Sequence, residues 1–179
     1  MRKVLYIFGL LTDADVQWMA NVGTQRRLTD GDVLISEGEP TESFILLLEG
    51  ELVASTRSLG QIARMGAGEV VGEMSLVDSA PPSATITASG NGLALFLNKT
   101  GLVQKLESDE GFGSRFYRAL AVFLADRLRD ARRVPGNHAM DEMAISDDEL
   151  DAGILDRVTS AGERFSRMLK SLSSSRPLS

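Results

Sequence analysis

Short apolar runs separated by glycines, between about Gln25 and Asn98, constrain the fold of this chain more than any other feature. Several short strands spaced about ten residues apart are typical of a sandwich, barrel or jelly roll. We also expect Glu49-Gly50-Glu51 to be the tip of a hairpin, because glycine adopts a positive φ without steric cost. The expected strands are VLIS (33–36), FILLLEGELVAS (44–55), QIARM (61–65), ATITAS (84–89) and LALFLN (93–98).

Helical periodicity flanks this β-rich region on both sides. Thr12, followed three residues later by Asp15, resembles an N-cap with its partner and predicts a helix over about residues 13–22. Beyond the strands we expect a short helix that ends near residue 108. A longer helix is predicted from about 113 to 133, because apolar residues recur there at three- and four-residue intervals.

The predicted strands and helices, together with the composition of the segments between them, divide the chain into four parts. Residues 1–134 are expected to form one domain, 135–148 an acidic linker, 149–172 an amphipathic helix and 173–179 a disordered tail. The polar face of the last helix mixes basic and acidic side chains, whereas a helix lying on a membrane surface favours a basic face. We therefore expect this helix to dock on protein, either on its own chain or on a partner.

Composition argues against several classes of partner and compartment. The formal net charge is -6, so the chain has no overall basic excess to neutralise nucleic-acid phosphates, and we expect no nucleic-acid partner. No apolar run approaches the ~20 residues that span a membrane, so we expect no membrane partner either. The chain has no cysteine, which fits a reducing compartment. We predict a cytoplasmic protein.

The residues needed for catalysis or for reading DNA are scarce. A cupin-like enzyme, the alternative from another class, needs several histidine ligands for its metal, whereas this chain has one histidine, His138, in the predicted linker. A Ser-His-Asp catalytic triad is not expected either, because it also needs a histidine placed among the strands and helices of the domain. Residues 136–179 carry five basic and eight acidic side chains and contain one predicted helix, which does not make a helix-turn-helix module. We expect a protein that is not an enzyme, with neither a catalytic residue nor a metal site.

Two stretches together resemble a known family. They are LTDGDVLISEGEPTESFILLLEGEL in the first half of the domain and GAGEVVGEMSL running into PSATI in the second. They resemble the cyclic-nucleotide-binding domain of the catabolite activator family and of the regulatory subunits of cyclic-nucleotide-dependent kinases, over about residues 5–133. The resemblance implies a mainly β fold with flanking α-helices: a double-stranded β-helix or jelly roll, known as the cyclic-nucleotide-binding β-roll, with helices at both ends.

The resemblance also implies a ligand site. In the family, a glycine and a short helix direct backbone N–H groups at the cyclic phosphate, and a glutamate accepts a hydrogen bond from the ribose 2′-hydroxyl. Gly72 and the amides of residues 74–76 match the first part, and Glu73 matches the second. A small or hydroxylated residue completes the phosphate shell, and Ser83 fits that place. The candidate ligand-binding residues are Gly72, Glu73, Met74, Ser75, Pro82, Ser83 and Ala84.

The arginine that binds phosphate in the family is missing. An alignment without gaps places Pro82 at its position, and proline has neither a charge nor an N–H to donate. Losing a charge-assisted hydrogen bond lowers affinity by about one to two orders of magnitude. With no arginine nearby in the sequence, the Glu73 carboxylate would also repel a phosphate. Arg57, Arg64 or Lys99 could substitute.

Three interpretations of the site stay open: an inherited scaffold that binds no ligand, an ordinary receptor for cAMP or cGMP, and a receptor for a cyclic dinucleotide or another nucleotide bound without the arginine. We expect a stand-alone regulatory module of bacterial type that binds nucleotide weakly and acts through protein–protein contacts. The long helix is expected either to form a homodimer interface or to cover its own β-roll. The interface candidates are Phe116, Leu120, Phe123, Leu124 and Leu128.

Overall fold

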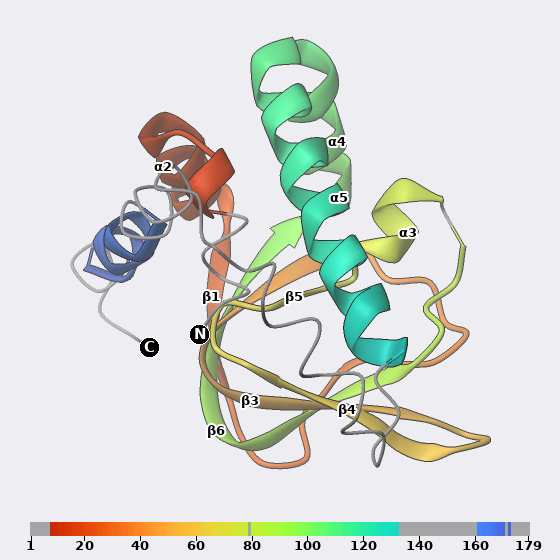
Figure 1. Cartoon of the computed structure of the whole chain (residues 1–179). Coiled ribbons are helices and arrows are strands. Elements are labelled where there is room, and N and C mark those ends of the chain that lie inside the picture. Colours follow the sequence, from red (N-terminus) through yellow and green to blue (C-terminus); the bar gives the residue numbers. More distant parts are fainter. Residues whose placement is uncertain (1–7, 79, 133–160, 171, 173–179) are drawn as a thin grey trace, which may run out of the picture.

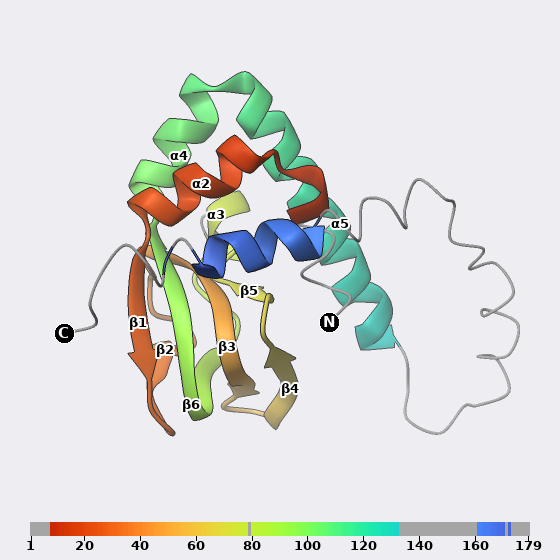
Figure 2. The same cartoon turned by 90° about the vertical axis from the view of Figure 1, so that its left-hand side faces the viewer.

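The computed structural model describes residues 8–78, 80–132, 161–170 and 172 of the chain. A β-roll occupies one part of the molecule, and the longer helices gather at one end and along one side of it (Figures 1 and 2). The predicted mainly β architecture with flanking helices is therefore confirmed. No helix in the described part of the chain is long and apolar enough to cross a membrane.

The β-roll is built on two long antiparallel strands. β3 and β6 pair along most of their length; β1 and β4 flank them in the order β1-β6-β3-β4, β2 pairs with β6 and β5 pairs with β3. The two expected strands 84–89 and 93–98 are one continuous strand in the structure, β6. The strands are β1 (Thr24–Leu28), β2 (Val33–Ile35), β3 (Ser43–Thr56), β4 (Gly60–Gly66), β5 (Val70–Val71) and β6 (Thr85–Asn98).

The hairpin expected at Glu49-Gly50-Glu51 is wrong. These residues lie inside β3, whose register against β6 shifts at this point. Gly50 does have a positive φ of 93°. A Cβ on Gly50 would lie 2.8 Å from the carbonyl oxygen of Asn91 and from Cα of Gly92. The glycine therefore permits a bulge and a close approach to β6, where the sequence suggested a reversal of the chain.

β3 separates two apolar cores. Residues Phe44 to Leu48 are all buried, and their side chains point alternately to opposite faces of the strand. Phe44, Leu46 and Leu48 belong to a cluster shared with the helices. Ile45 and Leu47 belong to a second cluster inside the roll. A strand buried on both faces reads as a continuous apolar run, which explains FILLL in the sequence.

The first described helix, α2, begins where the local sequence predicts, whereas α5 begins at Glu110, a few residues before its expected start. Thr12 caps α2 in a complete capping box with Asp15, as expected. The short helix α3 follows Glu73, and α4 and α5 follow the last strand. The bounds are α2 (Asp13–Val22), α3 (Met74–Val77), α4 (Lys99–Ser108) and α5 (Glu110–Arg132), and residues 161–170 form a further helix.

A buried ion pair joins α2 to α5. Arg115 donates from Nε and Nη2 to the two carboxylate oxygens of Asp15, at 2.7 and 2.8 Å. The Asp15 side chain is 5% exposed, and one of its oxygens also accepts the backbone N–H of Thr12. The same carboxylate therefore caps α2 and fixes α2 against α5.

The helix at 161–170 docks on its own chain, so the described part of the predicted C-terminal helix packs in cis. It lies alongside α2 in both views (Figures 1 and 2). Phe165 packs edge-on against Phe8 at 5.4 Å between ring centroids, and Arg164 forms an ion pair with Asp13 at 2.7 Å. Met168 is buried. The predicted linker at 135–148 with His138, residues 149–160 and the tail at 173–179 lie outside the described residues.

The five interface candidates on α5 differ in their surroundings. Phe116, Leu120 and Phe123 are 2%, 3% and 1% exposed and belong to the core of their own chain. Leu124 packs partly buried against that core, and Leu128 is 56% exposed. A homodimer through α5 stays a prediction, and of its five candidate residues Leu128 is the exposed one.

Candidate functional site

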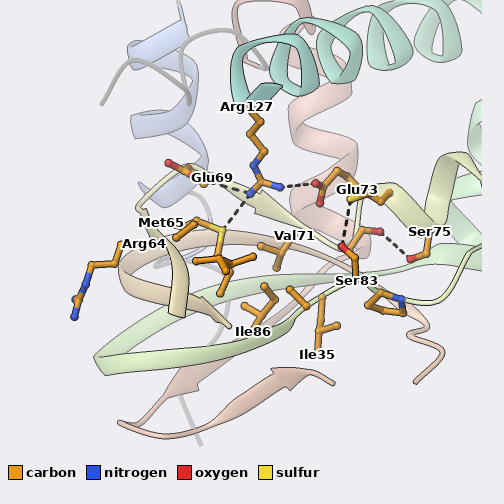
Figure 3. A pocket seen from close by; sticks show the side chains of 17 residues that line it. Ile35, Arg64, Met65, Glu69, Val71, Glu73, Ser75, Ser83, Ile86 and Arg127 are labelled. Carbon is orange, nitrogen blue, oxygen red and sulfur yellow. Dashed lines mark hydrogen bonds and ion pairs between the residues drawn. The ribbon is translucent and has the colours of Figure 1, made fainter. Parts of the chain in front are cut away.

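A cavity of about 730 Å³ opens between the β-roll and α5. Its volume lies within the range of about 300–1,000 Å³ that is usual for ligand pockets. Apolar side chains from β2, β4, β5 and β6 form its walls, and Arg127 reaches into it from α5 (Figure 3). The cavity brings together all the ligand-site candidates of the sequence, which are Gly72, Glu73, Met74, Ser75, Pro82, Ser83 and Ala84.

Gly72 allows the chain to turn sharply at the cavity. Its φ is 82°, and a Cβ at this position would lie 2.5 Å from the backbone oxygen of Ser43. Any other residue would therefore be strained in its backbone and would clash with β3. The glycine has a structural reason to be there whether or not a ligand binds.

The short helix α3 follows this turn and is tied to its neighbours. The Ser75 hydroxyl donates to the backbone oxygen of Gly72 at 3.4 Å and accepts a hydrogen bond from the ammonium of Lys99. Burial lowers the pKa of Lys99, although the carboxylates of Glu73 and Glu42 oppose this shift. Lys99 therefore fastens α3 to the start of α4.

Pro82 places an apolar ring on the cavity wall at the position where the resemblance predicts a cation. Its carbonyl oxygen accepts the backbone N–H of Gly38 at 2.8 Å, so the loop is held by a backbone contact. Proline has no N–H to offer a ligand. Ser83, next in the chain, also lines the cavity and is exposed.

The three cations expected as substitutes differ in position. Arg57 is not among the residues that line the cavity. Arg64 does line it, but its side chain is 56% exposed and forms an ion pair with Glu51. Lys99 donates to Ser75, as described above, and is not a lining residue.

Arg127 of α5 supplies a cation inside the cavity. Its Nη1 donates to Oε1 of Glu73 at 2.5 Å, and its Nη2 donates to the backbone oxygen of Val70 at 3.0 Å. The same Nη2 lies 3.8 Å from a carboxylate oxygen of Glu69. The guanidinium also lies over the ring of Phe123, 4.5 Å from its centroid. Arg127 thus links β5, Glu73 and α5 at one point (Figure 3).

Glu73 is almost completely buried, and its environment differs from the one expected. Its side chain is 3% exposed, and Arg127 forms an ion pair with it, so the expectation of a carboxylate without an arginine is wrong. Burial raises the pKa of Glu73, while the charge of Arg127 and its hydrogen bond work in the opposite direction. The carboxylate is therefore costly to bury, and Arg127 is its main charge compensation, with a smaller contribution from the charge of Lys99.

Replacing Glu73 with glutamine is expected to change how stability depends on pH. In the folded protein the pKa of Glu73 is raised above 4.5, so its contribution to stability is complete below 4.5 and is lost as pH rises through the raised value. Glutamine does not titrate. The variant should therefore gain stability relative to the wild type as pH rises, in urea unfolding from about pH 4 to pH 8. Glu107→Gln, at an exposed position, is the control. A Glu73→Gln difference that is constant across this range would contradict the prediction.

Sequence reasoning did not identify Arg127. The residue is separated from Glu73 by 54 positions, and no motif connects the two. One local sign exists: Arg127 lies four residues after Phe123, on the side of the helix that carries core residues. A charged residue on an apolar helix face indicates a buried or half-buried partner.

The arrangement of side chains in the cavity is suited to binding a ligand. Apolar walls surround a carboxylate and a guanidinium that compensate each other, next to a tight glycine turn and a serine hydroxyl. Within the described ranges, no group of three or more histidine, aspartate or glutamate side chains is arranged to hold a metal ion.

A comparison with family models finds a match within this chain. Residues 25–109 match the family model of the cyclic nucleotide-binding domain. The cAMP-dependent protein kinase regulatory subunit of Candida albicans is 33% identical over 104 residues, which cover 58% of this chain and 23% of that protein. The chain therefore spans less than a quarter of the length of this curated relative.

Two solved structures extend the similarity to three dimensions. A cyclic nucleotide-binding domain from Methylobacillus flagellatus KT is 25% identical with a TM-score of 0.64, covering 73% of this chain and 79% of that one. The N-terminal domain of a transcriptional regulator from Streptomyces coelicolor A3(2) is 26% identical with a TM-score of 0.59, covering 76% and 99% of the two chains. Both similarities extend beyond residues 25–109.

Proposed function

Because residues 25–109 of this chain belong to the cyclic nucleotide-binding domain family, we propose that the chain is a regulatory module whose cavity binds a cyclic nucleotide weakly or in an altered way. Binding of the ligand in the cavity alters the helices, and through these helices the module signals to a protein partner. The combination of an open cavity with Pro82 on its wall carries this proposal. The cavity has room for a ligand, and the family's phosphate contact is absent from its usual place.

The chemistry of the cavity supports ribose binding better than phosphate binding. Glu73 lies where the resemblance places the acceptor for the ribose 2′-hydroxyl, and it lines the cavity. Arg127 lines the cavity too, but its guanidinium is paired with Glu73 and bonded to Val70. A cyclic phosphate would therefore meet Pro82 and Ser83 without a charged partner at the family position.

Replacing Pro82 with arginine is expected to tighten cAMP binding about 10- to 100-fold, because it restores a charge-assisted hydrogen bond worth about 1.5–3 kcal/mol. The measurement is a calorimetric titration of the purified protein with cAMP and cGMP, preceded by thermal unfolding with both ligands. A ligand at 100 times its dissociation constant adds about 2.7 kcal/mol, a shift of several degrees for a protein of this size.

Pro81→Arg is the matched control for this experiment. It adds the same side chain one position earlier, at an exposed residue that does not line the cavity. A gain in affinity with Pro82→Arg alone supports the proposal. An equal gain in both variants would indicate a non-specific charge effect. No binding by either the wild type or Pro82→Arg would show that the cavity is an inherited scaffold.

A second candidate function is a receptor of ordinary affinity that uses Arg127 in place of the missing arginine. The observation in its favour is that Arg127 is a cation whose side chain lines the cavity and is still 27% exposed. The same titration separates the two candidates. Tight cAMP, cGMP or cyclic dinucleotide binding by the wild type, with no further gain in Pro82→Arg, would favour the receptor.

A further inference from the structure

We propose that one face of α2 is a docking site for an amphipathic, basic helix of a partner protein, and that the chain's own helix at 161–170 occupies this site when the partner is absent. The docking face is formed by Asp13, Val16, Gln17 and Ala20, which follow one another at intervals that place them on one side of α2. It shares no residue with the cavity of the β-roll, so the inference does not depend on a nucleotide.

The helix at 161–170 shows what kind of segment the docking face accepts. It runs alongside α2 (Figure 2) and presents an apolar stripe at intervals of three and four residues. Val16 and Ala20 of the docking face are buried in the same core as this stripe. The stripe consists of Ala161, Phe165, Met168 and Leu172. The first requirement for an occupant is therefore a helix with one continuous apolar side.

Charge adds a second requirement beside the apolar stripe. Arg164 donates from Nε to a carboxylate oxygen of Asp13 at 2.7 Å, and Nη2 of Arg167 lies 3.3 Å from the other oxygen. Arg164 also donates to the backbone oxygen of Phe8 at 3.1 Å. An acidic side chain at the edge of the docking face therefore favours a helix that carries two basic residues three positions apart.

Two observations indicate that the occupant can be exchanged. The Asp13 side chain is 60% exposed, and ion pairs of exposed groups add little stability and are screened by salt. A gap of about 90 Å³ also remains between the docking face and Arg164, Arg167 and Met168. Atoms that line a gap lose packing contacts, so the chain's own helix fills the docking face incompletely. A partner helix with a larger apolar side chain at the gap would gain contacts that the chain's own helix lacks.

The covalent connection sets the strength of the competition. Residues 133–160 join α5 to the helix at 161–170, and a tether of this kind gives a docked segment an effective concentration on the order of 1 mM. A free helix with a dissociation constant of about 10–100 µM for the docking face is then weakened about 10- to 100-fold by the chain's own helix. Release of that helix would uncover an apolar surface with a polar rim, which is typical of protein–protein contact sites.

The experiment measures the binding of a fluorescent peptide with the sequence of residues 160–173 to the full chain by anisotropy. Phe165→Asp with Met168→Asp removes the apolar contacts of the chain's own helix and gives an undocked variant. The peptide should bind this variant about 10- to 100-fold more tightly than the wild type. Urea unfolding checks that the variant is folded, and Phe165→Ala with Met168→Ala is the milder replacement if it is not. Equal binding by the wild type and a folded undocked variant, or no binding by either, would overturn the proposal.

A charge exchange tests the position of the site. Asp13→Arg in the undocked variant should weaken peptide binding about 3- to 10-fold, and a peptide carrying Arg164→Glu and Arg167→Glu should recover most of this loss. Glu107→Arg makes the same charge change at an exposed position of α4 and should leave binding unchanged. A loss with Glu107→Arg equal to that with Asp13→Arg would indicate a general charge effect and overturn the assignment to α2.

Two further measurements separate a partner protein from other occupants. A peptide with Met168→Phe should bind about 2- to 5-fold more tightly, because the larger side chain fills part of the gap. Weaker binding would show that the chain's own helix already fits best and would overturn the exchange. Light scattering should give the same mass for the wild type and the undocked variant. A wild-type dimer that the undocked variant loses would identify a second copy as the occupant and overturn the assignment to a partner protein.

Discussion

Replacing Phe116 with alanine is expected to lower the free energy of unfolding by about 3–5 kcal/mol. The side chain is 2% exposed, and its ring lies 5.5 Å from that of Phe44 on β3 and 5.6 Å from that of Phe112. Removing it would leave a cavity where α5 meets the face of the sheet that packs against the helices. Because residues of both the helix and the central strand β3 enclose the ring, the site has little freedom to collapse around the missing side chain.

Tyr117→Ala is the matched control for Phe116→Ala. Tyr117 is the next aromatic residue on α5, is 47% exposed and touches Phe116 only edge-on at 6.3 Å between centroids. Its removal should cost about 1 kcal/mol. Urea unfolding gives the stabilities, and light scattering gives the mass of each protein. A Phe116→Ala variant that keeps its stability and halves its mass would instead place this residue in an interface between two copies.

Replacing Arg115 with glutamine is expected to lower the free energy of unfolding by about 3 kcal/mol at neutral pH. This is the lower end of the range for breaking a buried ion pair, because Arg115 is itself partly exposed. The Asp15 carboxylate would lose both of its bonds to the guanidinium while staying buried. Thr12 would remain as a hydrogen-bond partner, but it carries no charge. Arg118→Gln, an exposed position on the same helix, is the control and should change stability by about 0.5 kcal/mol or less.

The cost of Arg115→Gln should depend on pH in a defined direction. Burial raises the pKa of Asp15, but hydrogen bonds from Arg115 and Thr12 outweigh burial and bring it below 3.8. A lowered pKa gives stability that is complete above 3.8 and is lost as pH falls through the folded value. The difference between the wild type and Arg115→Gln in urea unfolding should therefore be largest near neutral pH and shrink below about pH 4. A difference that grows in acid would contradict this assignment.

Features that depend on neighbouring residues were predictable from the sequence. Thr12 and Asp15 indicated the start of α2, because a capping box is made within four residues. All the ligand-site candidates line the cavity: they come from two short segments, residues 72–75 and 82–84, to which the family resemblance pointed. The resemblance to a family gave the overall fold, which periodicity alone left as a sandwich, barrel or jelly roll.

Features that depend on distant residues were not predictable. The positive φ of Gly50 was predicted correctly. Whether such a glycine ends a strand or forms a bulge within it depends on the pairing with β6, about 40 residues later in the chain. The pairing of Arg127 with Glu73 likewise depends on how α5 crosses the β-roll. The wide apolar side of α5 suggested a dimer, whereas the chain's own strands and helices bury Phe116, Leu120 and Phe123.

The docking of the helix at 161–170 bears on the order in which the chain folds. Arg164 donates to the backbone oxygen of Phe8 at 3.1 Å, across 156 residues of sequence. Contacts with such large separations form late, because the entropy of closing the intervening loop is lost before they contribute. During synthesis, the apolar surface of Phe8 and α2 therefore stays incompletely covered until the helix at 161–170 has left the ribosome. The β-roll, whose strands all precede residue 99, has its full sequence available long before that moment.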